Sequence, residues 1–268
     1  FLLSINGGTD TIRLVNAASA QENYWIEQIK FADGTIWTRD TLGGNTLPYT
    51  AGNDVIDGTQ DADSIRGGGG NDTLRGLGGN DTLRGDEGND TLDGGNGNDR
   101  MIGGTGNDEI WEGEGDDTYV WNLGDGDDLI RNGGWWDGFN TVEFGPGITA
   151  ADLRYELIND GRDLRISVAG QPGSVTLEAA LTSWDGERVD RLLFADGSTL
   201  SKSAYLAAAI AARPTAGNDS LYGSVFADTL VGGAGNDTID GRQGNDVLIG
   251  GTGDDFLAGA GDNDVYRF

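Results

Sequence analysis

The chain has 268 residues, and its 45 acidic and 17 basic side chains give it a formal net charge of −28. A protein that binds nucleic acid needs a basic surface for the phosphates, so this charge excludes that class. Histidine and cysteine are absent, which excludes disulfides, thiol nucleophiles, histidine bases and zinc sites with nitrogen or sulfur ligands. No apolar run is long enough to cross a bilayer, and the first residues lack the pattern of a secretory signal peptide.

Two kinds of segment alternate along the chain. Residues 51–130 hold 20 acidic and 4 basic residues, and residues 216–268 hold 9 and 2. These two glycine-rich blocks therefore carry 23 of the 28 net negative charges, while the segments before and between them are nearly balanced. We expect four parts: the C-terminal part of a linking domain at 1–47, a repeat array at 48–130, a β-rich linking domain at 131–214 and a second array at 215–268.

The glycine-rich blocks repeat with a period of nine residues. An aspartate recurs at every ninth position from Asp54 to Asp117, and a large apolar side chain follows two residues after each. The second block repeats in the same way from Asp219 to Asp264. Nonapeptides such as GGGGNDTLR at 67–75 fit the pattern of calcium-binding parallel β-helices. The fourteen copies in register make chance an unsatisfactory explanation.

Each nonapeptide combines a turn with a short strand. Glycines allow the positive φ of tight turns, and the residues that follow, such as Thr73-Leu74-Arg75, form a strand with one apolar side chain facing inward. One inward side chain per strand makes a thin core, so the coils must stack on one another. Stacking places aspartate above aspartate, and a hard divalent cation with oxygen ligands would relieve their repulsion.

The two blocks resemble the RTX (repeats-in-toxin) arrays of secreted bacterial proteins. The resemblance implies that two nonapeptides make one coil of a right-handed parallel β-roll, with about four coils in the first array and three in the second. It also implies several calcium ions between turns, held by the sixth-position aspartates and by turn carbonyls. The implied carboxylate ligands are Asp54, Asp72, Asp81, Asp90, Asp99, Asp108, Asp117, Asp219, Asp237, Asp246 and Asp255. The implied turn glycines are Gly67, Gly70, Gly79, Gly88, Gly97, Gly106, Gly235, Gly244 and Gly253.

Both arrays depart from the family pattern in their second repeat. Asp61 and Phe226 stand where the fourth-position glycine is expected, and Asp262 stands there in the last repeat. We therefore expect calcium at the turns before Asp63 and Asp228 less than at the other turns. The asparagines that precede the sixth-position aspartates are expected to shape the turns, and they include Asn71, Asn80, Asn89 and Asn98.

The balanced segments are copies of each other. The stretch IEQIKFADGT at 26–35 corresponds to VDRLLFADGS at 189–198, and the two arrays begin with the same TAGND sequence, at 50–54 and at 215–219. We therefore expect the chain to be a fragment of a longer protein built from repeated modules, each with one linking domain and one array. The linking segment resembles the haemolysin-type calcium-binding related domain, including its EFGPGIT-x-x-DL stretch from Glu143 to Leu153.

Within the linking segment, alternating polar and apolar residues predict strands at 164–168 and 174–177, with a hairpin turn at 159–161. A short helix is expected from Ser201 to Ala212. The pair Trp135-Trp136 has two interpretations, a cover on the end of the first roll or a contact with a sugar or membrane surface. The predicted fold is all-β, with two calcium-binding parallel β-rolls joined by a small β-rich linking domain that contains one short helix.

Other interpretations of the acidic blocks explain less. A flexible acidic tract would not need an apolar residue at every ninth position, although it describes the calcium-free state well. EF-hand loops require a twelve-residue pattern that is missing here. Two carboxylates are sufficient for glycoside hydrolysis, but the nine-residue period already accounts for nearly every clustered aspartate. The chain is therefore not expected to be an enzyme, and no catalytic residue is assigned.

The expected function is calcium-driven folding outside the cell. At low calcium the carboxylates of each array repel one another and keep the chain expanded, a form suited to a secretion channel. At the extracellular calcium concentration of about 10⁻³ M the arrays bind calcium and fold. The expected partners are calcium ions, the type I secretion machinery and either a second copy or a cell-surface glycan. The parent protein is expected to be a secreted structural, adhesive or carrier protein. A pore-forming toxin and a secreted hydrolase with its catalytic domain elsewhere are the alternatives.

Overall fold

The computed structural model describes most of the chain from residue 51 onward, together with four short strands near the N-terminus. The described ranges are 51–111, 113–131, 138–159, 161–180, 189–211 and 216–268. The four short strands are β1 (Leu2–Ser4), β2 (Thr11–Arg13), β3 (Gln28–Lys30) and β4 (Ile36–Thr38). β1 pairs with β2, and β3 pairs with β4, both antiparallel. Trp135 and Trp136 lie outside the described residues, so both of their interpretations stay predictions.

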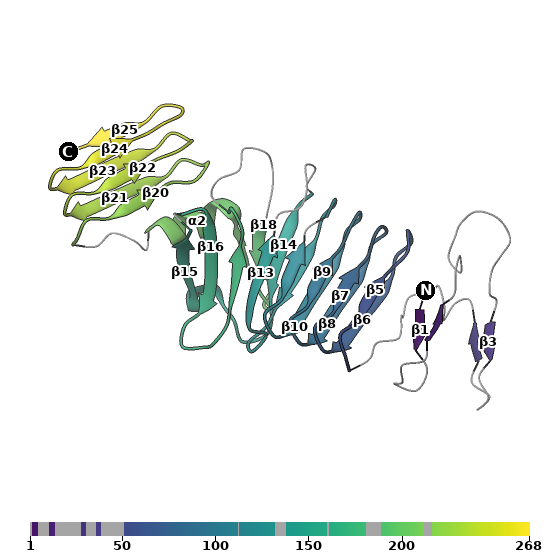
Figure 1. Cartoon of the computed structure of the whole chain (residues 1–268). Helices are drawn as coiled ribbons and strands as arrows, with labels where there is room; N and C mark the ends of the chain where they lie inside the picture. The colour runs from purple at the N-terminus through teal and green to yellow at the C-terminus, as the bar shows by residue number, and fades with distance from the viewer. Residues whose placement is uncertain are drawn as a thin grey trace.

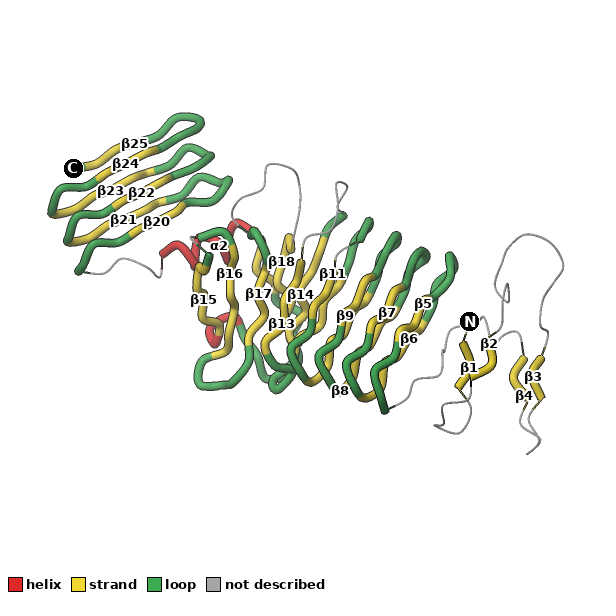
Figure 2. Tube along the Cα trace, in the orientation of Figure 1, coloured by secondary structure: helices red, strands yellow, loops and turns green. Residues whose placement is uncertain are grey.

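The first array forms a roll of two parallel β-sheets that the chain visits in alternation (Figure 1 and Figure 2). One sheet contains β5 (Val55–Asp57), β7 (Thr73–Arg75), β9 (Thr91–Asp93), β11 (Glu109–Trp111) and β13 (Asp127–Arg131). The other contains β6 (Ser64–Gly69), β8 (Thr82–Glu87), β10 (Arg100–Thr105), β12 (Thr118–Trp121) and β14 (Asn140–Phe144). Each strand pairs in register with the strand two nonapeptides further on, as Thr82 does with Arg100, so two nonapeptides make one coil. Residues 55–121 form the four coils of stacked parallel strands that the nonapeptides predict, and β13 and β14 add a fifth coil.

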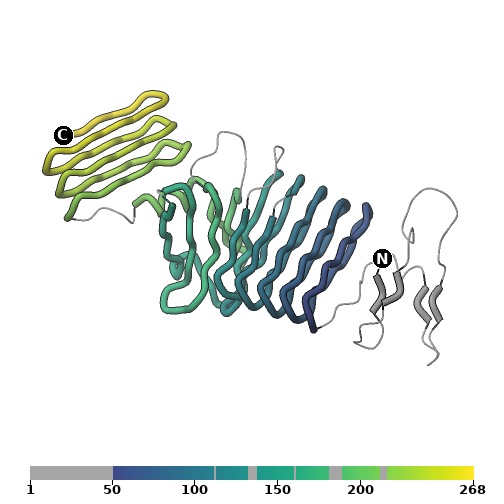
Figure 3. Tube along the Cα trace, viewed as in Figure 1, coloured from purple at the N-terminus to yellow at the C-terminus, as the bar shows by residue number. Residues whose placement is uncertain are grey.

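The apolar residue of each nonapeptide fills the space between the two sheets. Leu74, Leu83, Leu92 and Met101 are completely buried. Leu74 lies beside Leu92 in one sheet, and Leu83 lies beside Met101 in the facing sheet. Each such side chain contributes roughly 1.5–3 kcal/mol when it leaves water. Because a coil supplies only two of them, no coil is stable without neighbours, and the roll grows by stacking (Figure 3).

The linking segment prolongs both sheets of the first roll. β13 pairs in parallel with β17 (Ser174–Leu177), and β14 pairs in parallel with β18 (Val189–Leu193). Two antiparallel strands, β15 (Leu153–Ile158) and β16 (Asp163–Val168), then complete one sheet, and β19 (Thr199–Ser201) completes the other. The predicted strands at 164–168 and 174–177 are thus present. Because β13 crosses residue 130 without a break in pairing, the linking segment closes the roll rather than standing apart from it.

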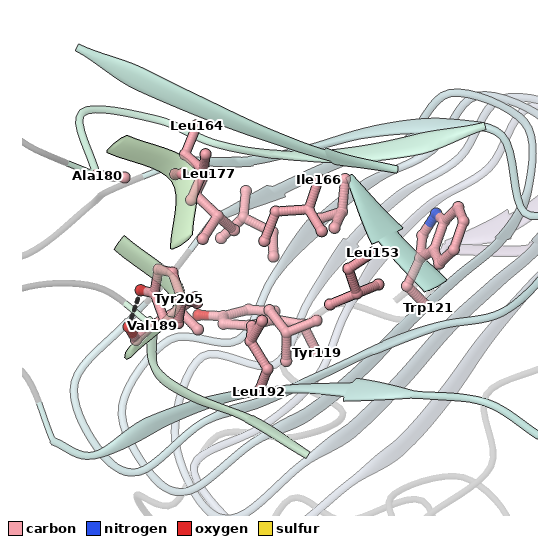
Figure 4. Packing of buried hydrophobic residues seen from close by; sticks show 14 of the residues in the cluster. Tyr119, Trp121, Leu153, Leu164, Ile166, Leu177, Ala180, Val189, Leu192 and Tyr205 are labelled. Carbon is pink, nitrogen blue, oxygen red and sulfur yellow. Dashed lines mark hydrogen bonds between the residues drawn. The ribbon is translucent and has the colours of Figure 1, made fainter. Parts of the chain in front are cut away.

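A larger apolar core fills the closed end of the first roll (Figure 4). The Trp121 and Phe144 rings meet edge to face at 6.0 Å, and Phe144 stacks on Phe194 at 5.6 Å. The Tyr205 hydroxyl donates a hydrogen bond to the Val189 carbonyl oxygen. The sheets here are no longer joined by the turns of the nonapeptides. Large aromatic side chains, rather than single leucines, fill the space between them.

The predicted helix is present as α2 (Lys202–Ala211), and a short 3₁₀ helix, η1 (Ala150–Asp152), precedes β15. The Ser201 hydroxyl caps α2 by accepting a hydrogen bond from the Ala204 amide at 3.3 Å. The buried face of α2 carries Tyr205, Leu206, Ala209 and Ile210. None of the helices in the described ranges is long and apolar enough to cross a membrane.

The second array forms a shorter roll with three strands in each of two parallel sheets. One sheet contains β20 (Ser220–Tyr222), β22 (Thr238–Asp240) and β24 (Phe256–Ala258). The other contains β21 (Thr229–Ala234), β23 (Val247–Thr252) and β25 (Val265–Arg267). These strands make the three coils predicted for this array. Leu230, Ile239 and Leu248 repeat the buried apolar column of the first roll.

Replacing one leucine of the buried column should weaken the whole first roll. For Leu83→Ala, the lost contacts and the remaining cavity should reduce the free energy of unfolding in saturating calcium by about 2–5 kcal/mol. Leu77→Ala is the matched control, because the same change is made at a side chain that is 42% exposed. Urea unfolding followed by circular dichroism measures both, and equal losses for the two variants would contradict the assigned core.

Candidate metal centre

The sixth-position aspartates form ladders along the rolls. In each ladder, the Oδ1 atom of one aspartate accepts a hydrogen bond from the backbone amide of the aspartate one coil earlier. The Asp54 amide donates to Asp72 at 2.7 Å, the Asp72 amide donates to Asp90 at 2.7 Å, and the Asp90 amide donates to Asp108 at 2.8 Å. The other ladder of the first roll contains Asp63, Asp81, Asp99 and Asp117. The second roll has the ladders Asp219, Asp237, Asp255 and Asp228, Asp246, Asp264.

The second oxygen of these carboxylates is buried without a hydrogen-bond partner. This holds for the Oδ2 atoms of Asp72, Asp81, Asp90, Asp99, Asp108, Asp237 and Asp246. Their residues are between 1% and 2% exposed, so water does not replace the missing donor. A buried acceptor without a partner is costly, and a buried carboxylate costs more unless a positive charge lies beside it. Seven such oxygens along the ladders indicate sites for cations.

The first-position glycines leave room beside these oxygens. A Cβ atom on Gly85 would lie less than 3.0 Å from both Asp90 Oδ2 and the carbonyl oxygen of Gly103, which belongs to the next coil. Gly67 and Gly232 have the same surroundings, each with its own aspartate and the carbonyl of the next coil's glycine. A carboxylate oxygen and a main-chain carbonyl therefore converge at each of these turns, and both are ligands that calcium prefers. Among the described residues, no three acidic side chains gather at one point, so main-chain oxygens have to supply much of each site.

The predicted fourth-position glycines also lie along the stacked turns. All eight of them have positive φ, from +104° at Gly244 to +139° at Gly106. Their backbones approach the preceding coil so closely that a Cβ on Gly88 would lie less than 3.0 Å from the Gly70 carbonyl oxygen. The structure thus brings together the predicted aspartates and the predicted glycines at the turns. The sequence interpretation named only Gly67 among the first-position glycines, whereas Gly76, Gly85, Gly94, Gly103, Gly232, Gly241 and Gly250 have the same contact with an Asp Oδ2 atom.

The fifth-position asparagines form ladders of their own. The Asn71 amide donates to Asn53 Oδ1 at 2.8 Å, and the Asn89 amide donates to Asn71 Oδ1 at 2.9 Å. The Asn107 amide continues the series by donating to Asn89 Oδ1 at 2.8 Å. These side chains were expected to shape their own turns, but they also join each coil to the next. Asparagine recurs at this position in five consecutive nonapeptides, from Asn71 to Asn107, so each one has another asparagine one coil away, and this is the signal that could have predicted the role.

The second turn of each array satisfies its aspartate in a different way. Asp63 Oδ2 accepts hydrogen bonds from the Thr59 amide at 2.6 Å and the Thr59 hydroxyl at 2.8 Å. Asp228 Oδ2 accepts the same two bonds from Ser224, at 2.6 and 2.9 Å. These are the turns in which a fourth-position glycine is missing. In these turns the Oδ2 atom accepts hydrogen bonds from a hydroxyl and an amide. The equivalent Oδ2 atoms of seven aspartates in the turns that follow have no donor.

One candidate ligand, Asp128, does not lie at a position that the nine-residue period predicts. Its Oδ1 accepts a hydrogen bond from the Asp108 amide at 3.0 Å, which extends the first ladder by one coil. Gly126 stands two residues before it with φ of +112°, as a fourth-position glycine does. The stretch from Gly124 to Ile130 follows the repeat pattern G-x-G-x-D-x-I, but two extra residues precede it. A search that allowed such an insertion would have found Asp128.

Burial makes these carboxylates hard to ionise in the metal-free fold. Removal from water raises the pKa of Asp81 and Asp90 to about 6, of Asp108 to about 7 and of Asp128 to about 8. The bonds from backbone amides oppose these shifts, whereas neighbouring carboxylates add to them, as Asp125 does at Asp128. The ionised ladder therefore needs a positive charge to be stable inside the roll.

Two family models match the chain. The RTX calcium-binding nonapeptide repeat matches residues 49–83, 75–110, 84–119, 214–248 and 240–267. The haemolysin-type calcium binding protein related domain matches residues 1–41. The chain therefore contains RTX repeats that bind calcium ions, in the two blocks identified from their period. Asp128 lies outside these matches, and the resemblance of Glu143 to Leu153 to the related domain stays a prediction.

Comparison with individual proteins adds little detail. No curated protein sequence matches the chain. Among solved structures, the extracellular lipase LipA from Serratia marcescens is similar with 24% sequence identity and a TM-score of 0.18. The match covers 66% of this chain and 30% of the lipase chain, so the chain spans less than a third of that protein's length.

A methyl group at a first-position glycine should damage one metal site. In Gly85→Ala, the new Cβ would meet Asp90 Oδ2 and the Gly103 carbonyl oxygen, and the strain should reduce stability in calcium by about 1–3 kcal/mol. Gly69→Ala is the matched control, because its Cβ would have no neighbour closer than 3.6 Å. Isothermal titration calorimetry with calcium should show fewer or weaker sites in Gly85→Ala alone. Equal binding by both variants would exclude this turn as a site.

Without calcium, acid should favour the folded rolls. The folded pKa values of Asp90, Asp108 and Asp128 lie above the ordinary value of 3.8, so the folded chain binds protons more tightly than the unfolded chain. The resulting stabilisation is full at low pH and is lost as the pH rises through about 6 to 8. Circular dichroism in excess chelator should therefore show β structure decreasing across this range. The variant Asp108→Asn/Asp128→Asn should flatten that dependence, and an unchanged profile would contradict it.

Proposed function

We propose that this chain of RTX calcium-binding nonapeptide repeats is a calcium-dependent structural region of a large secreted bacterial protein. The observation that carries the proposal is the pair of aspartate ladders in the first roll, in which the buried Oδ2 atoms of Asp72, Asp81, Asp90, Asp99 and Asp108 lack donors. In extracellular calcium the two rolls would be folded and stiff. In the low calcium of the cytosol the same residues would keep the chain expanded.

Electrostatic repulsion within the arrays favours the expanded form. Residues 51–130 carry a net charge of −16, from 20 acidic and 4 basic residues. Stacked carboxylates such as Asp90 and Asp108 raise each other's free energy when they are both ionised, in addition to the cost of their burial. Only two apolar side chains per coil oppose these terms, so the metal-free roll has little to hold it together.

The residues at the turns are suited to hold calcium. Bound calcium would supply the positive charge that offsets burial and repulsion of the carboxylates. Asp72, Asp81, Asp90, Asp99 and Asp108 would offer Oδ2 atoms in the first roll, and Asp237 and Asp246 would offer them in the second. The carbonyls of first-position glycines in the next coil would offer further oxygens. Since these oxygens converge only when coils stack, binding would be coupled to folding.

Extracellular modules that bind calcium weakly, with dissociation constants of about 10⁻⁴ to 10⁻³ M, match the calcium concentration outside cells. A chain that folds only there would pass unfolded through a type I secretion channel and then be trapped outside by folding. We favour a structural or adhesive role for the parent protein, with self-association or a cell-surface glycan as its contacts. The reason is that the linking segment prolongs the sheets of the first roll and joins the rolls in series.

Two other roles of the parent protein follow from the same repeats. Calcium-dependent rolls would serve equally as the carrier region of a pore-forming toxin or as the folding module of a secreted hydrolase. Neither role changes what the described residues do, because the turns hold oxygens for a cation in each case. The rolls themselves are structural elements, and we assign them no catalytic residue.

A calcium titration followed by far-UV circular dichroism tests the proposal. The chain should gain β structure cooperatively between sub-millimolar and millimolar calcium, and magnesium should not replace calcium because it requires a smaller and more regular site. In the variant Asp81→Asn/Asp90→Asn, each new side-chain amide keeps an oxygen that accepts the ladder hydrogen bond but lacks the negative charge, so the transition should move to higher calcium. A chain that is fully folded in excess chelator at neutral pH would contradict the proposal.

A further inference from the structure

The second roll touches the linking segment at the tip of the β15–β16 hairpin. Gly161, at this tip, has φ of +74°, and a Cβ on it would lie 2.7 Å from the Tyr222 ring. Tyr222 is the last residue of β20, the first strand of the second roll. On the other side of the contact, α2 packs against β15, β18 and β21, so one helix touches both bodies. The two rolls are therefore joined by more than the peptide chain between them.

Arg242 lies at the centre of this contact. Its guanidinium carbon is 5.3 Å from the centre of the Tyr222 ring, an arrangement typical of a cation–π interaction. Its Nη2 atom donates a hydrogen bond to the Gly161 carbonyl oxygen at 3.4 Å, although the two residues are far apart in the sequence. One side chain of the second roll thus binds both its own first coil and the tip of the linking segment.

The backbone at Arg242 is unfavourable for an arginine. Its φ is +69°, in the left-handed region that favours glycine. The equivalent second position of other turns is commonly glycine with positive φ, as at Gly68, Gly233 and Gly251. Leu77, Asp86 and Ala260 stand at the same turn position and also have positive φ, so the turn imposes this backbone on whichever residue is there. What Arg242 adds at this position is its contact with the Gly161 carbonyl and the Tyr222 ring.

Arg242 also belongs to a candidate calcium turn. It follows Gly241, whose Cβ position faces Asp246 Oδ2, and this oxygen is among the buried carboxylate oxygens without a donor. The turn that places Arg242 is thus one whose formation depends on a cation under the proposed function. Loss of the cation would loosen the backbone at this turn and the arginine with it.

We propose that the turn from Gly241 to Asp246 is a calcium-dependent clamp, in which Arg242 binds Tyr222 and the Gly161 carbonyl and so fixes the second roll on the linking segment. This inference rests on the proposed calcium-dependent folding and adds a partner surface to it. Calcium then sets the angle between successive rolls as well as the fold of each. A chain of such modules would be stiff at its joints only when calcium is present.

The first roll offers a matched position for the test. Leu77 occupies the same place in the first array as Arg242 does in the second, and it has φ of +75°. Glycine at either position would relieve the same backbone strain. Only Arg242→Gly would also remove the contact with the linking segment, so the two variants separate the clamp from the turn.

Spin labels can measure the joint directly, because the chain contains no cysteine. Labels at Gln171→Cys in the linking segment and Thr238→Cys in β22 are both at exposed positions outside the contact. Double electron–electron resonance in millimolar calcium should give a narrow distance distribution for the parent chain and for Leu77→Gly. Arg242→Gly should lose the narrow peak, while its far-UV circular dichroism and thermal unfolding in calcium stay at or above those of the parent. Tyr222→Ala should also lose the narrow peak.

The outcomes separate this inference from the proposed function. If the parent chain gains no β structure with calcium, the proposed function fails before the joint is considered. If it folds with calcium but Arg242→Gly keeps the narrow distribution, the rolls fold as proposed and the clamp is wrong. A narrow distribution for the parent chain in excess chelator would also overturn the clamp, because the joint would then not depend on calcium.

Discussion

The structure depends on one constraint, the burial of stacked carboxylates in the turns of a parallel roll. Two nonapeptides make a coil, so each aspartate lies one coil away from the next and gives its Oδ1 atom to the amide of the one before it. That arrangement satisfies the backbone but leaves the buried Oδ2 atoms of seven aspartates, from Asp72 to Asp108 in the first roll and at Asp237 and Asp246 in the second, without a donor. A fold with this feature is incomplete without positive charge, and the apolar columns between the sheets are too thin to compensate.

The glycines of the repeat are required at different places for different reasons. At the first position, Gly85 needs no unusual backbone angle, but a side chain there would occupy the space between Asp90 Oδ2 and the next coil's carbonyl. At the fourth position, Gly88 has φ of +130° and lies directly against the preceding coil. Substitutions at the two positions therefore disturb different properties, the ligand space in one case and the turn and stacking distance in the other.

The sequence predicts the rolls well because their period is both local and strict. An aspartate stands at every ninth position, and one buried residue such as Leu83 follows each, so strand positions, coil number and ladder members can be counted. The linking segment has no such rule. β13 pairs with β17, which lies far along the chain beyond β14, β15 and β16, and no local repeat predicts that pairing. Asp128 was missed for a related reason, since two inserted residues moved it out of the period while the hydrogen bonds continued.

The ends of the ladders show how a column of charge can stop inside a protein. At the start of each array, Thr59 and Ser224 give a hydroxyl and an amide to the aspartate of the second turn. At the far end of one ladder, the Asp117 amide donates to Asn140, so a neutral amide takes the place of the next carboxylate. The Asn140 amide in turn donates to Asp190 in the linking segment at 2.8 Å. Thr59 and Ser224 thus supply donors to the first carboxylate of a ladder, whereas the neutral side chain of Asn140 stands between the carboxylates of Asp117 and Asp190. The residues at the ends of a ladder therefore determine how its first and last carboxylates are satisfied.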